Sequence, residues 1–142
     1  MIMNFLNILS TSAGGLNAQR LRMNLISSNM ANINTTRTED GRPYRRKDAV
    51  FEAVNQKEFG DTLETLLTDV RVREIVEDKR PYIMKYDPGH PDANKEGYVA
   101  MPNISVIEEM VNMISASRSY EANVSAIKTT KDMVNAALEI GR

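Results

Sequence analysis

The chain has 142 residues, is 42% hydrophobic and 26% charged, and carries a formal net charge of −1. This composition is typical of a folded protein of about one domain, and the near-neutral charge gives no global attraction to nucleic acid or to a membrane surface. The sequence contains no cysteine, which excludes disulfides and thiolate metal sites. It also has no run of about 18 apolar residues, so we expect no insertion into a membrane.

The first 36 residues are poor in charge and follow a seven-residue repeat. They contain two basic residues, Arg20 and Arg22, and no acidic residue. Mostly apolar residues recur at alternating spacings of four and three, which predicts a coiled-coil helix. A second stripe makes the apolar face wider than a two-stranded coil needs, so we expect more than one partner helix. The repeat consists of Phe5, Leu9, Ser12, Leu16, Gln19, Met23, Ile26, Met30 and Ile33, and the second stripe of Ala18, Leu21 and Leu25.

Two consecutive glycines, Gly14 and Gly15, interrupt this predicted helix. Each glycine costs about 1 kcal/mol relative to alanine in a helix interior. Two interpretations carry equal weight at this stage: the pair is a flexible joint, or it permits the close approach of another helix.

The middle of the chain, residues 37–102, is charged and rich in turn residues. A strand is predicted from about Tyr44 to Val54, a strand rather than a helix from Leu66 to Glu77, and a short strand over the sequence YVAM. A turn-rich connector with four of the five prolines lies between residue 81 and the final helix. A small β domain or an extended hairpin fits these signals.

Residues 103–142 repeat the pattern of the first 36. A second long helix is predicted, with Asn103 as its N-cap or with Ser105 and Glu108 forming a capping box. The repeat consists of Val106, Met110, Met113, Ser117, Tyr120, Val124, Ile127, Lys131, Val134 and Leu138, flanked by a stripe of Ile107, Val111 and Ile114. We therefore expect a mainly α protein with a small β part, in which helices at 1–36 and 103–142 pair as a coiled coil and together form one core domain.

The predicted helices are too long to be covered by the rest of the chain. Each predicted helix, 1–36 and 103–142, exceeds 30 residues, or roughly 45 Å or more at 1.5 Å per residue, whereas the mean helix has about 11–12 residues. The surplus apolar surface would exceed the patch of a few hundred Å² that a typical monomer exposes. We expect it to be buried against other subunits, and the helices of the isolated chain to be poorly folded until then.

Few residues point to catalysis or to ligand binding. The basic run Arg45–Lys47 is followed by acidic residues, which favours a solvated or subunit-facing strand over a nucleic-acid contact. His90 is the only histidine, so a catalytic triad or a zinc site lacks its companions. Residues 92–97 resemble the start of a calcium loop, but the twelfth position is Asn103 instead of a bidentate glutamate. A tight turn is the better interpretation, and we predict no enzyme, no cofactor and no metal site.

Both ends of the chain resemble one family. The head, NILSTSAGGLNAQRLRMNLISSNMANINTT, is similar to the N-terminal motif of bacterial flagellar rod, hook and axial proteins, whose Ser-x-Asn-x-Ala-Asn-x-Asn-Thr pattern runs here from Ser27 to Thr35. The tail, EEMVNMISASRSYEANVSAIKTTKDMVNAALEI, resembles the C-terminal motif of the same group. The short length and the segments PYRRKDAVFEA and HPDANKEGYVAMPNI are similar to those of proximal-rod proteins of the basal body.

This resemblance implies a structural protein. Such a subunit polymerises through its terminal helices into the tubular drive shaft that transmits torque from motor to hook and through which export continues. The implied partners are copies of itself, other flagellar rod proteins and the adaptor subunit beside the export gate, with the flagellar type III export apparatus met in transit. The implied location is the periplasmic rod of the basal body, reached without a cleaved signal peptide.

Asn29, Asn32 and Asn34 lie in an otherwise apolar run, although asparagine is a poor helix former. A polar residue in a packed seam fixes register and partner at a cost in stability, so we predict that these amides bond to a neighbouring subunit or cap the helix end. The sequence SRSYEAN in the tail is expected to act similarly. The predicted subunit-interface residues are Leu9, Leu16, Met23, Ile26, Asn29, Met30, Asn32, Ile33, Asn34, Met110, Met113, Arg118, Tyr120, Glu121, Asn123, Val124 and Ile127.

Two other functions share some of these features. A free-standing coiled-coil adaptor would have the same periodicity, but it would form a small oligomer of defined size. A glycan-cleaving enzyme would need a spare globular domain with a pair of carboxylates, and the turn-rich middle of the chain supplies none.

Overall fold

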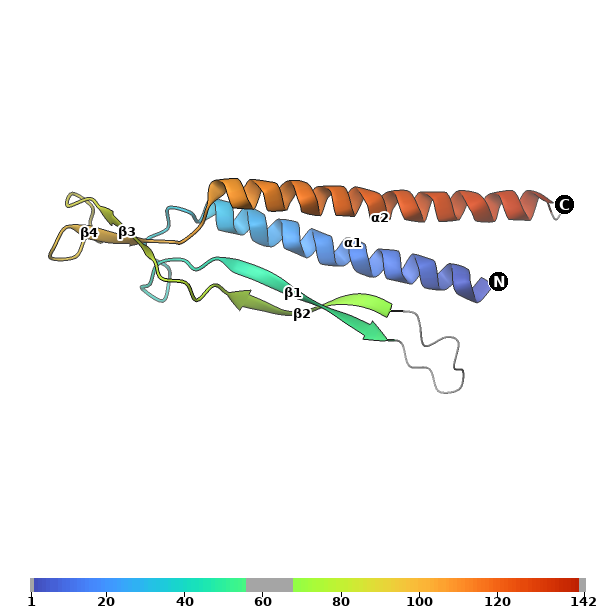
Figure 1. Ribbon diagram of the computed structural model, residues 1–142, viewed down its shortest axis with the longest axis horizontal. Coiled ribbons are helices and arrows are strands. Elements are labelled where there is room, and N and C mark those ends of the chain that lie inside the picture. The colour runs from blue at the N-terminus through green and yellow to red at the C-terminus, as the bar shows by residue number, and fades with distance from the viewer. Residues whose placement is uncertain (1, 56–67, 141–142) are drawn as a thin grey trace.

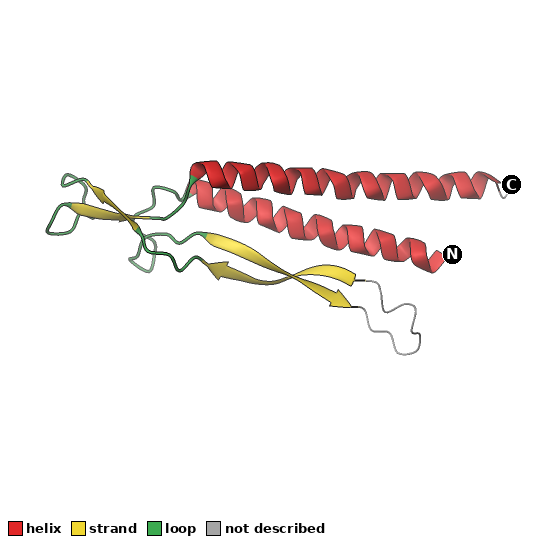
Figure 2. Ribbon diagram, viewed as in Figure 1, coloured by secondary structure: helices red, strands yellow, loops and turns green. Residues whose placement is uncertain are grey.

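The computed structural model describes residues 2–55 and 68–140, which form two long helices and two antiparallel hairpins (Figures 1 and 2). Helix α1 spans Ile2–Ala31 and helix α2 spans Val106–Ile140. Between them, β1 (Lys47–Asn55) pairs with β2 (Thr68–Glu77), and β3 (Ile83–Tyr86) pairs with β4 (Tyr98–Met101). The prediction of long terminal helices with a small β part between them is confirmed.

Helix α1 lies between helix α2 and the β1–β2 hairpin. It contacts α2 on one side and both strands of the hairpin on another, and the two helices run antiparallel, with the two chain ends at the same end of the molecule (Figure 1). A helix that is covered on two sides has few positions at which a charge stays hydrated, which explains the charge-poor head of the sequence. We expected a second partner helix for α1; within the chain this second partner is a hairpin.

The two glycines of α1 face these two neighbours. A Cβ atom on Gly15 would lie 3.0 Å from Nδ2 of Asn123 in α2, and a Cβ atom on Gly14 would lie 3.1 Å from the carbonyl oxygen of Val70 in β2 and closer still to the carboxylate of Asp69. Helix α1 continues through both positions. The glycines therefore permit close approach on both sides of α1, and the alternative of a joint that interrupts the helix is not supported.

Helix α1 ends earlier than the sequence indicated, at Ala31. The Nδ2 group of Asn32 donates a hydrogen bond to the carbonyl of Ser28 (2.9 Å), and its Oδ1 accepts one from the Thr35 hydroxyl (3.1 Å). These bonds satisfy groups that the helix end leaves free. Ile33 and Asn34 therefore lie beyond the helix, and the prediction that Ile33 continues the helical seam is wrong.

Helix α2 begins after Ser105, whose Oγ accepts a hydrogen bond from the backbone N–H of Glu108 (3.4 Å). This contact supports Ser105 as the N-cap, instead of Asn103.

The strands of the middle segment were predicted in part. β1, β2 and β4 lie close to the predicted strands, although the expected start of the second strand at Leu66 lies outside the described residues. β3 was missed, because it has only four residues between Pro81 and Pro88 and its residues are all exposed. A short exposed strand lacks the alternation of buried and exposed positions from which strands are recognised.

The buried side of α2 differs from its predicted seam. Glu109, Ala116 and Thr130 are buried, whereas the predicted seam residues Met110 and Val124 are 51% and 44% exposed. Close approach at Gly15 favours small and polar residues on the facing helix, so a seam of large apolar residues is displaced from the contact. In α2, five predicted seam positions are partly buried: Met113, Ser117, Tyr120, Ile127 and Val134. In α1, Ser12 and Ile26 are buried, and the partly buried seam positions are Leu9, Leu16, Gln19, Met23 and Met30. The side chain of Phe5 lies outside the described part.

We predict that Gly14→Ala lowers the free energy of unfolding by about 1–3 kcal/mol, because overpacking against β2 outweighs the gain in helix propensity. Gly89→Ala is the matched control, since its Cβ would meet only a carboxylate oxygen at 3.8 Å. Urea denaturation followed by circular dichroism measures both. If Gly14→Ala were as stable as the control or more stable, the close approach would not constrain the packing of α1.

Candidate functional site: a buried polar junction and an exposed helix face

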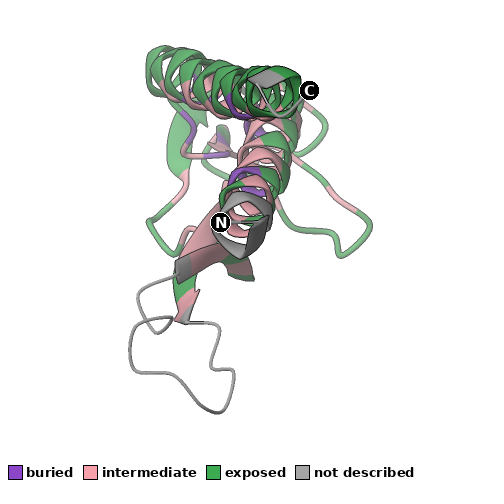
Figure 3. Ribbon diagram, turned by 90° about the vertical axis from the view of Figure 1, so that its right-hand side faces the viewer, coloured by how far each residue is buried: buried purple, intermediate pink, exposed green. Residues whose placement is uncertain are grey.

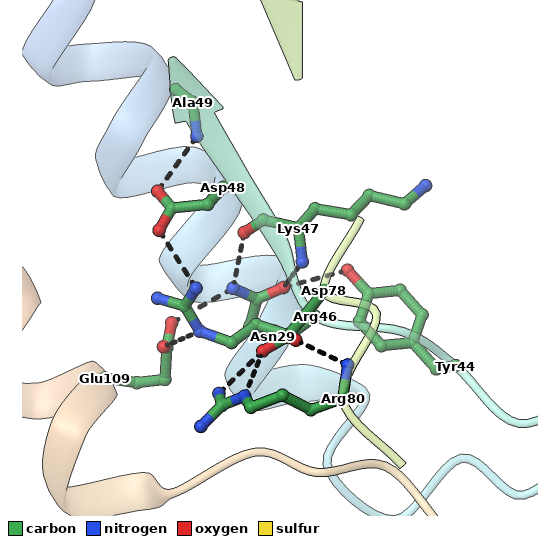
Figure 4. Close-up of polar contacts among 9 residues, drawn as sticks. All are labelled: Asn29, Tyr44, Arg46, Lys47, Asp48, Ala49, Asp78, Arg80 and Glu109. Carbon is green, nitrogen blue, oxygen red and sulfur yellow. Dashed lines mark hydrogen bonds and ion pairs between the residues drawn. The ribbon is translucent and has the colours of Figure 1, made fainter. Parts of the chain in front are cut away.

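The side-chain amide of Asn29 joins the end of α1 to β1 and α2 (Figure 4). Asn29 is 0% exposed. Its Nδ2 donates hydrogen bonds to the carbonyl of Lys47 (2.9 Å) and to Oε2 of Glu109 (3.1 Å). Its Oδ1 accepts them from the backbone N–H of Lys47 (2.9 Å) and from the hydroxyl of Tyr44 (3.1 Å). An amide side chain offers two donor protons and two acceptor sites, so Asn29 is fully bonded within its own chain.

Glu109, in the first turn of α2, is the charged centre of this junction. It is 0% exposed, and its Oε1 accepts a 2.7 Å hydrogen bond from Nε of Arg46. A terminal guanidinium nitrogen of Arg46 also contacts Oδ2 of Asp48 at 2.9 Å. Removing one member of such a buried pair is strongly destabilising, because it leaves an uncompensated buried charge. We call Asn29, Tyr44, Arg46 and Glu109 the polar junction.

The electrostatics of the polar junction favour a charged Arg46. Burial lowers the pKa of the Arg46 guanidinium, but hydrogen bonds from this group to Glu109 and Asp48, together with their negative charges, outweigh burial and raise the pKa above its usual value. Arg46 therefore remains positively charged at every physiological pH and balances Glu109. The charged guanidinium of Arg46 thus links β1 to α2, and Asn29 adds α1 to the same contact.

Asn29 also blocks the outer edge of β1. The N–H of Asp78 donates to the carbonyl of Arg46 (2.8 Å), so in an antiparallel pair the next residue, Lys47, points its backbone groups away from β2. Both of these Lys47 groups bond to Asn29. Two residues on, the N–H of Ala49 donates to Oδ1 of Asp48 (2.9 Å). Unpaired strand edges invite pairing with other chains. At this edge, Asn29 satisfies the backbone groups of Lys47, and Asp48 satisfies the N–H of Ala49.

The predicted asparagine sites have different environments. The amide of Asn29, which we predicted to bond to another subunit, makes four hydrogen bonds within its own chain. Asn32 caps the end of α1, and Asn34 is exposed. In α2, Nδ2 of Asn123 donates to the carbonyl of Ser119 (2.9 Å) beside Gly15. Arg118 and Glu121 are exposed, and the Ser117 hydroxyl donates to Glu121 at 3.4 Å.

Three members of the polar junction were missed as functional residues from the sequence: Tyr44, Arg46 and Glu109. Arg46 and Glu109 lie 63 positions apart, so no local pattern connects them. A signal was present in the seven-residue spacing of Glu109, Ala116, Asn123 and Thr130, but their small or polar side chains hide it from a search for apolar seams. Arg46 was treated only as part of a basic run.

The outer face of α2 is exposed and apolar. Ile107, Val111 and Ile114 are 75%, 61% and 54% exposed, and most of the outer surface of α2 is exposed in the end-on view (Figure 3). We call the following residues the outer stripe: Val106, Ile107, Met110, Val111, Ile114 and Val124. Two members of the predicted interface, Met110 and Val124, belong to this stripe instead of the intramolecular contact.

Other features singled out in the sequence are accounted for by local contacts. Residues 94–98 form the predicted tight turn, in which Oδ1 of Asn94 accepts hydrogen bonds from the N–H groups of Glu96 and Tyr98, both at 2.9 Å. The guanidinium of Arg45 stacks on the ring of Tyr82 at 4.5 Å. Within residues 2–55 and 68–140, no three His, Asp or Glu side chains cluster as metal ligands, and neither helix meets the length and hydropathy of a membrane span.

We predict that Asn29→Ala destabilises the chain by about 3 kcal/mol or more, because each buried partner left unsatisfied costs about 1–3 kcal/mol. Asn34→Ala is the control, since Asn34 is exposed and should change stability by less than about 0.5 kcal/mol. Denaturant unfolding of both variants tests this difference. Equal stabilities would show that the polar junction does not hold the three elements together.

Comparison with known proteins identifies related families at both ends of the chain. The family described as flagella basal body rod protein matches residues 9–37, and the C-terminal family of flagellar basal body rod FlgEFG proteins matches residues 95–140. The two matches cover most of α1 and the segment from β4 through α2. They leave out the β1–β2 hairpin.

Relatives match over nearly the full chain. The flagellar basal-body rod protein FlgC of Borreliella burgdorferi is 45% identical over 97% of this chain and 98% of its own length. FlgC of Bacillus subtilis is 43% identical over 94% and 96%, and that of Yersinia enterocolitica is 43% identical over 99% and 100%. The chain therefore belongs to the FlgC family of flagellar basal-body rod proteins, and it is a structural subunit of the rod.

Proposed function

We propose that this subunit polymerises in the proximal rod through the outer stripe of α2 and the free parts of α1, forming the tubular shaft that transmits torque from motor to hook. Membership of the FlgC family supports a rod subunit over the free-standing adaptor and the glycan-cleaving enzyme. The single observation that carries the mode of assembly is the outer stripe, which nothing in the chain covers in the described residues.

The outer stripe has the chemistry of an interface. Its members are large and apolar, and the most exposed of them, Ile107, lies within the first turns of α2 at 75% exposure. Burying such surface contributes roughly 25 cal/mol per Å². Contiguous exposed apolar patches of this kind mark sites of protein–protein contact, so assembly stabilises a subunit that exposes this face when alone.

We further propose that polar residues around the stripe set the register between subunits. Arg118 and Glu121 are exposed on α2, and Asn34 is exposed just past the end of α1. Charged and amide groups at the margin of an apolar contact discriminate between alternative registers, because a wrong register leaves them unpaired. Arg118, Glu121 and Asn34 thus act at the contact between subunits. Asn29, Asn32 and Asn123, in contrast, make hydrogen bonds that stabilise the fold of the single subunit.

Membership of the FlgC family supports an assembly with other rod proteins. We infer coiled-coil packing of the terminal helices in the inner wall of the rod, with contacts to copies of this chain, to other rod proteins and to the adaptor subunit beside the export gate. Transit through the flagellar type III export apparatus without a cleaved signal peptide, and a periplasmic position, complete the proposal. A narrow export channel favours a chain whose long helices gain much of their burial only on assembly.

The assembly surface is tested in a motile bacterium that lacks its own FlgC and is complemented with this chain. We expect the double variant Ile107→Asp/Ile114→Asp to abolish motility and rod formation, because two charges would be buried at a subunit contact. Ser115→Asp is the matched control on an exposed polar position of the same helix. Swimming in soft agar and electron microscopy of basal bodies give the result; normal rods in the double variant contradict the proposal.

Folding on assembly gives a separate prediction. Beyond Thr130, every described side chain of α2 is exposed except the half-buried Val134, and Met133 and Leu138 are both 67% exposed. We expect rapid amide exchange in residues 131–140 of the isolated chain and slow exchange around the polar junction, since few buried contacts support the last turns. Hydrogen exchange with mass spectrometry measures both. Strong protection throughout α2 in the isolated chain contradicts coupled folding.

A further inference from the structure

The β3–β4 hairpin carries a second uncovered apolar surface, at the opposite end of the molecule from the chain termini (Figure 1). Residue pairing in the hairpin places Met84 opposite Ala100 and Tyr86 opposite Tyr98. Alternate residues of a strand share a face, so these four uncharged side chains lie on one face. Met84, Tyr86 and Tyr98 are 54%, 64% and 40% exposed. We call these three residues the hairpin patch.

The hairpin patch is held rigid by its own loop. The rings of Tyr86 and Tyr98 meet edge to face, with centroids 5.3 Å apart. Gly97 has a φ of +82°, and a Cβ there would lie 2.9 Å from the Tyr86 ring, so the ring packs directly on the glycine backbone. Asn94 binds the N–H of Tyr98 through its side chain and the carbonyl of Tyr98 through its own N–H (2.8 Å). A preorganised aromatic surface loses little entropy on binding.

The composition of this surface is that of a contact site. Tyrosine and methionine are enriched in the cores of protein interfaces, while charged residues are depleted there. The contacts within the hairpin leave Met84, Tyr86 and Tyr98 54%, 64% and 40% exposed, on a small hairpin that projects beyond the helices (Figure 1). The β1–β2 hairpin, in contrast, directs part of its surface to α1.

We propose that the hairpin patch of one copy packs on the outer stripe of α2 in a second copy. This inference rests on the proposed function and names the partner of the outer stripe. Repeated copies of one chain can form an open helical assembly only through two different, complementary surfaces. The chain offers two such uncharged surfaces, and they lie on different elements.

The two surfaces also match in size. From its first to its last Cα, a four-residue strand spans roughly 10 Å at 3.4 Å per residue, and the helix from Ile107 to Ile114 spans roughly 11 Å at 1.5 Å per residue. With the three residues of the hairpin patch on one side and Ile107, Val111 and Ile114 of the outer stripe on the other, the contact falls well short of the roughly 1,200 Å² that stable pairs of proteins bury. It therefore holds within a polymer, where each subunit makes several contacts, and does not produce a free dimer.

Disulfide cross-linking tests this contact, because the natural chain contains no cysteine. Basal bodies are isolated from the complemented strain carrying Met84→Cys/Val111→Cys and are oxidised. We expect cross-linked dimers and larger multimers of this chain on a denaturing gel in the double variant, because each copy carries both cysteines of a head-to-tail contact, and none in either single variant. Assembled rods that yield no dimer, or a dimer in a single variant, overturn the proposal.

A charge exchange gives a second measurement that does not depend on the cysteine variants assembling. Met84→Lys should abolish motility, and adding Val111→Glu should restore it, because the two charges meet across the contact. Absence of rescue, with both chains still folded by circular dichroism, contradicts the pairing. If Ile107→Asp/Ile114→Asp blocks assembly while cross-link and rescue are both absent, the outer stripe binds another partner and only this inference fails. If that double variant assembles normally, the proposed function fails as well.

Discussion

A carboxylate buried at the start of α2 determines how the elements of this chain meet. Glu109 is 0% exposed, and a buried charge is tolerated only when it is paired and hydrogen-bonded. Its two partners come from other elements: Arg46 precedes β1, and Asn29 lies near the end of α1. The three elements must therefore converge at one end of the helix pair. From that point the helices extend in one direction, and the β3–β4 hairpin projects in the other (Figure 1).

The packing along α1 follows from the same convergence. Because α1 lies between α2 and the β1–β2 hairpin, it needs small residues on two sides, and the consecutive Gly14 and Gly15 face β2 and α2 respectively. The intramolecular face of α2 accordingly carries Ala116 and Thr130, which leaves its larger apolar residues on the opposite face. Close approach of the backbones therefore explains both the small residues at the contact between the helices and the exposed outer stripe.

Local sequence patterns predicted both long helices and most of the strands. The helices follow from seven-residue repeats, and the strands from strand and turn signals, all of which depend only on nearby residues. Half of the predicted α2 seam is exposed instead of facing α1. The residues that do face α1, such as Glu109, Ala116 and Asn123, are small or polar and are not recognised by a search for large apolar residues. The amide of Asn29 was recognised as needing partners, but its partners Lys47 and Glu109 are 18 and 80 positions away. Contacts at such separations depend on the tertiary fold, so neither the polar junction nor the intramolecular role of Asn29 was accessible from local pattern.

The division of α2 into an inner face that maintains the subunit and an outer face for assembly is the central claim of this account. It is tested most directly by thiol labelling of Ile114→Cys, with Ala116→Cys as the buried comparison, in the isolated chain and in assembled rods. The account predicts rapid maleimide labelling at position 114 in the isolated chain, at least about tenfold slower labelling in rods, and little labelling at position 116 in either state. Equal labelling of position 114 in the isolated chain and in rods would contradict it.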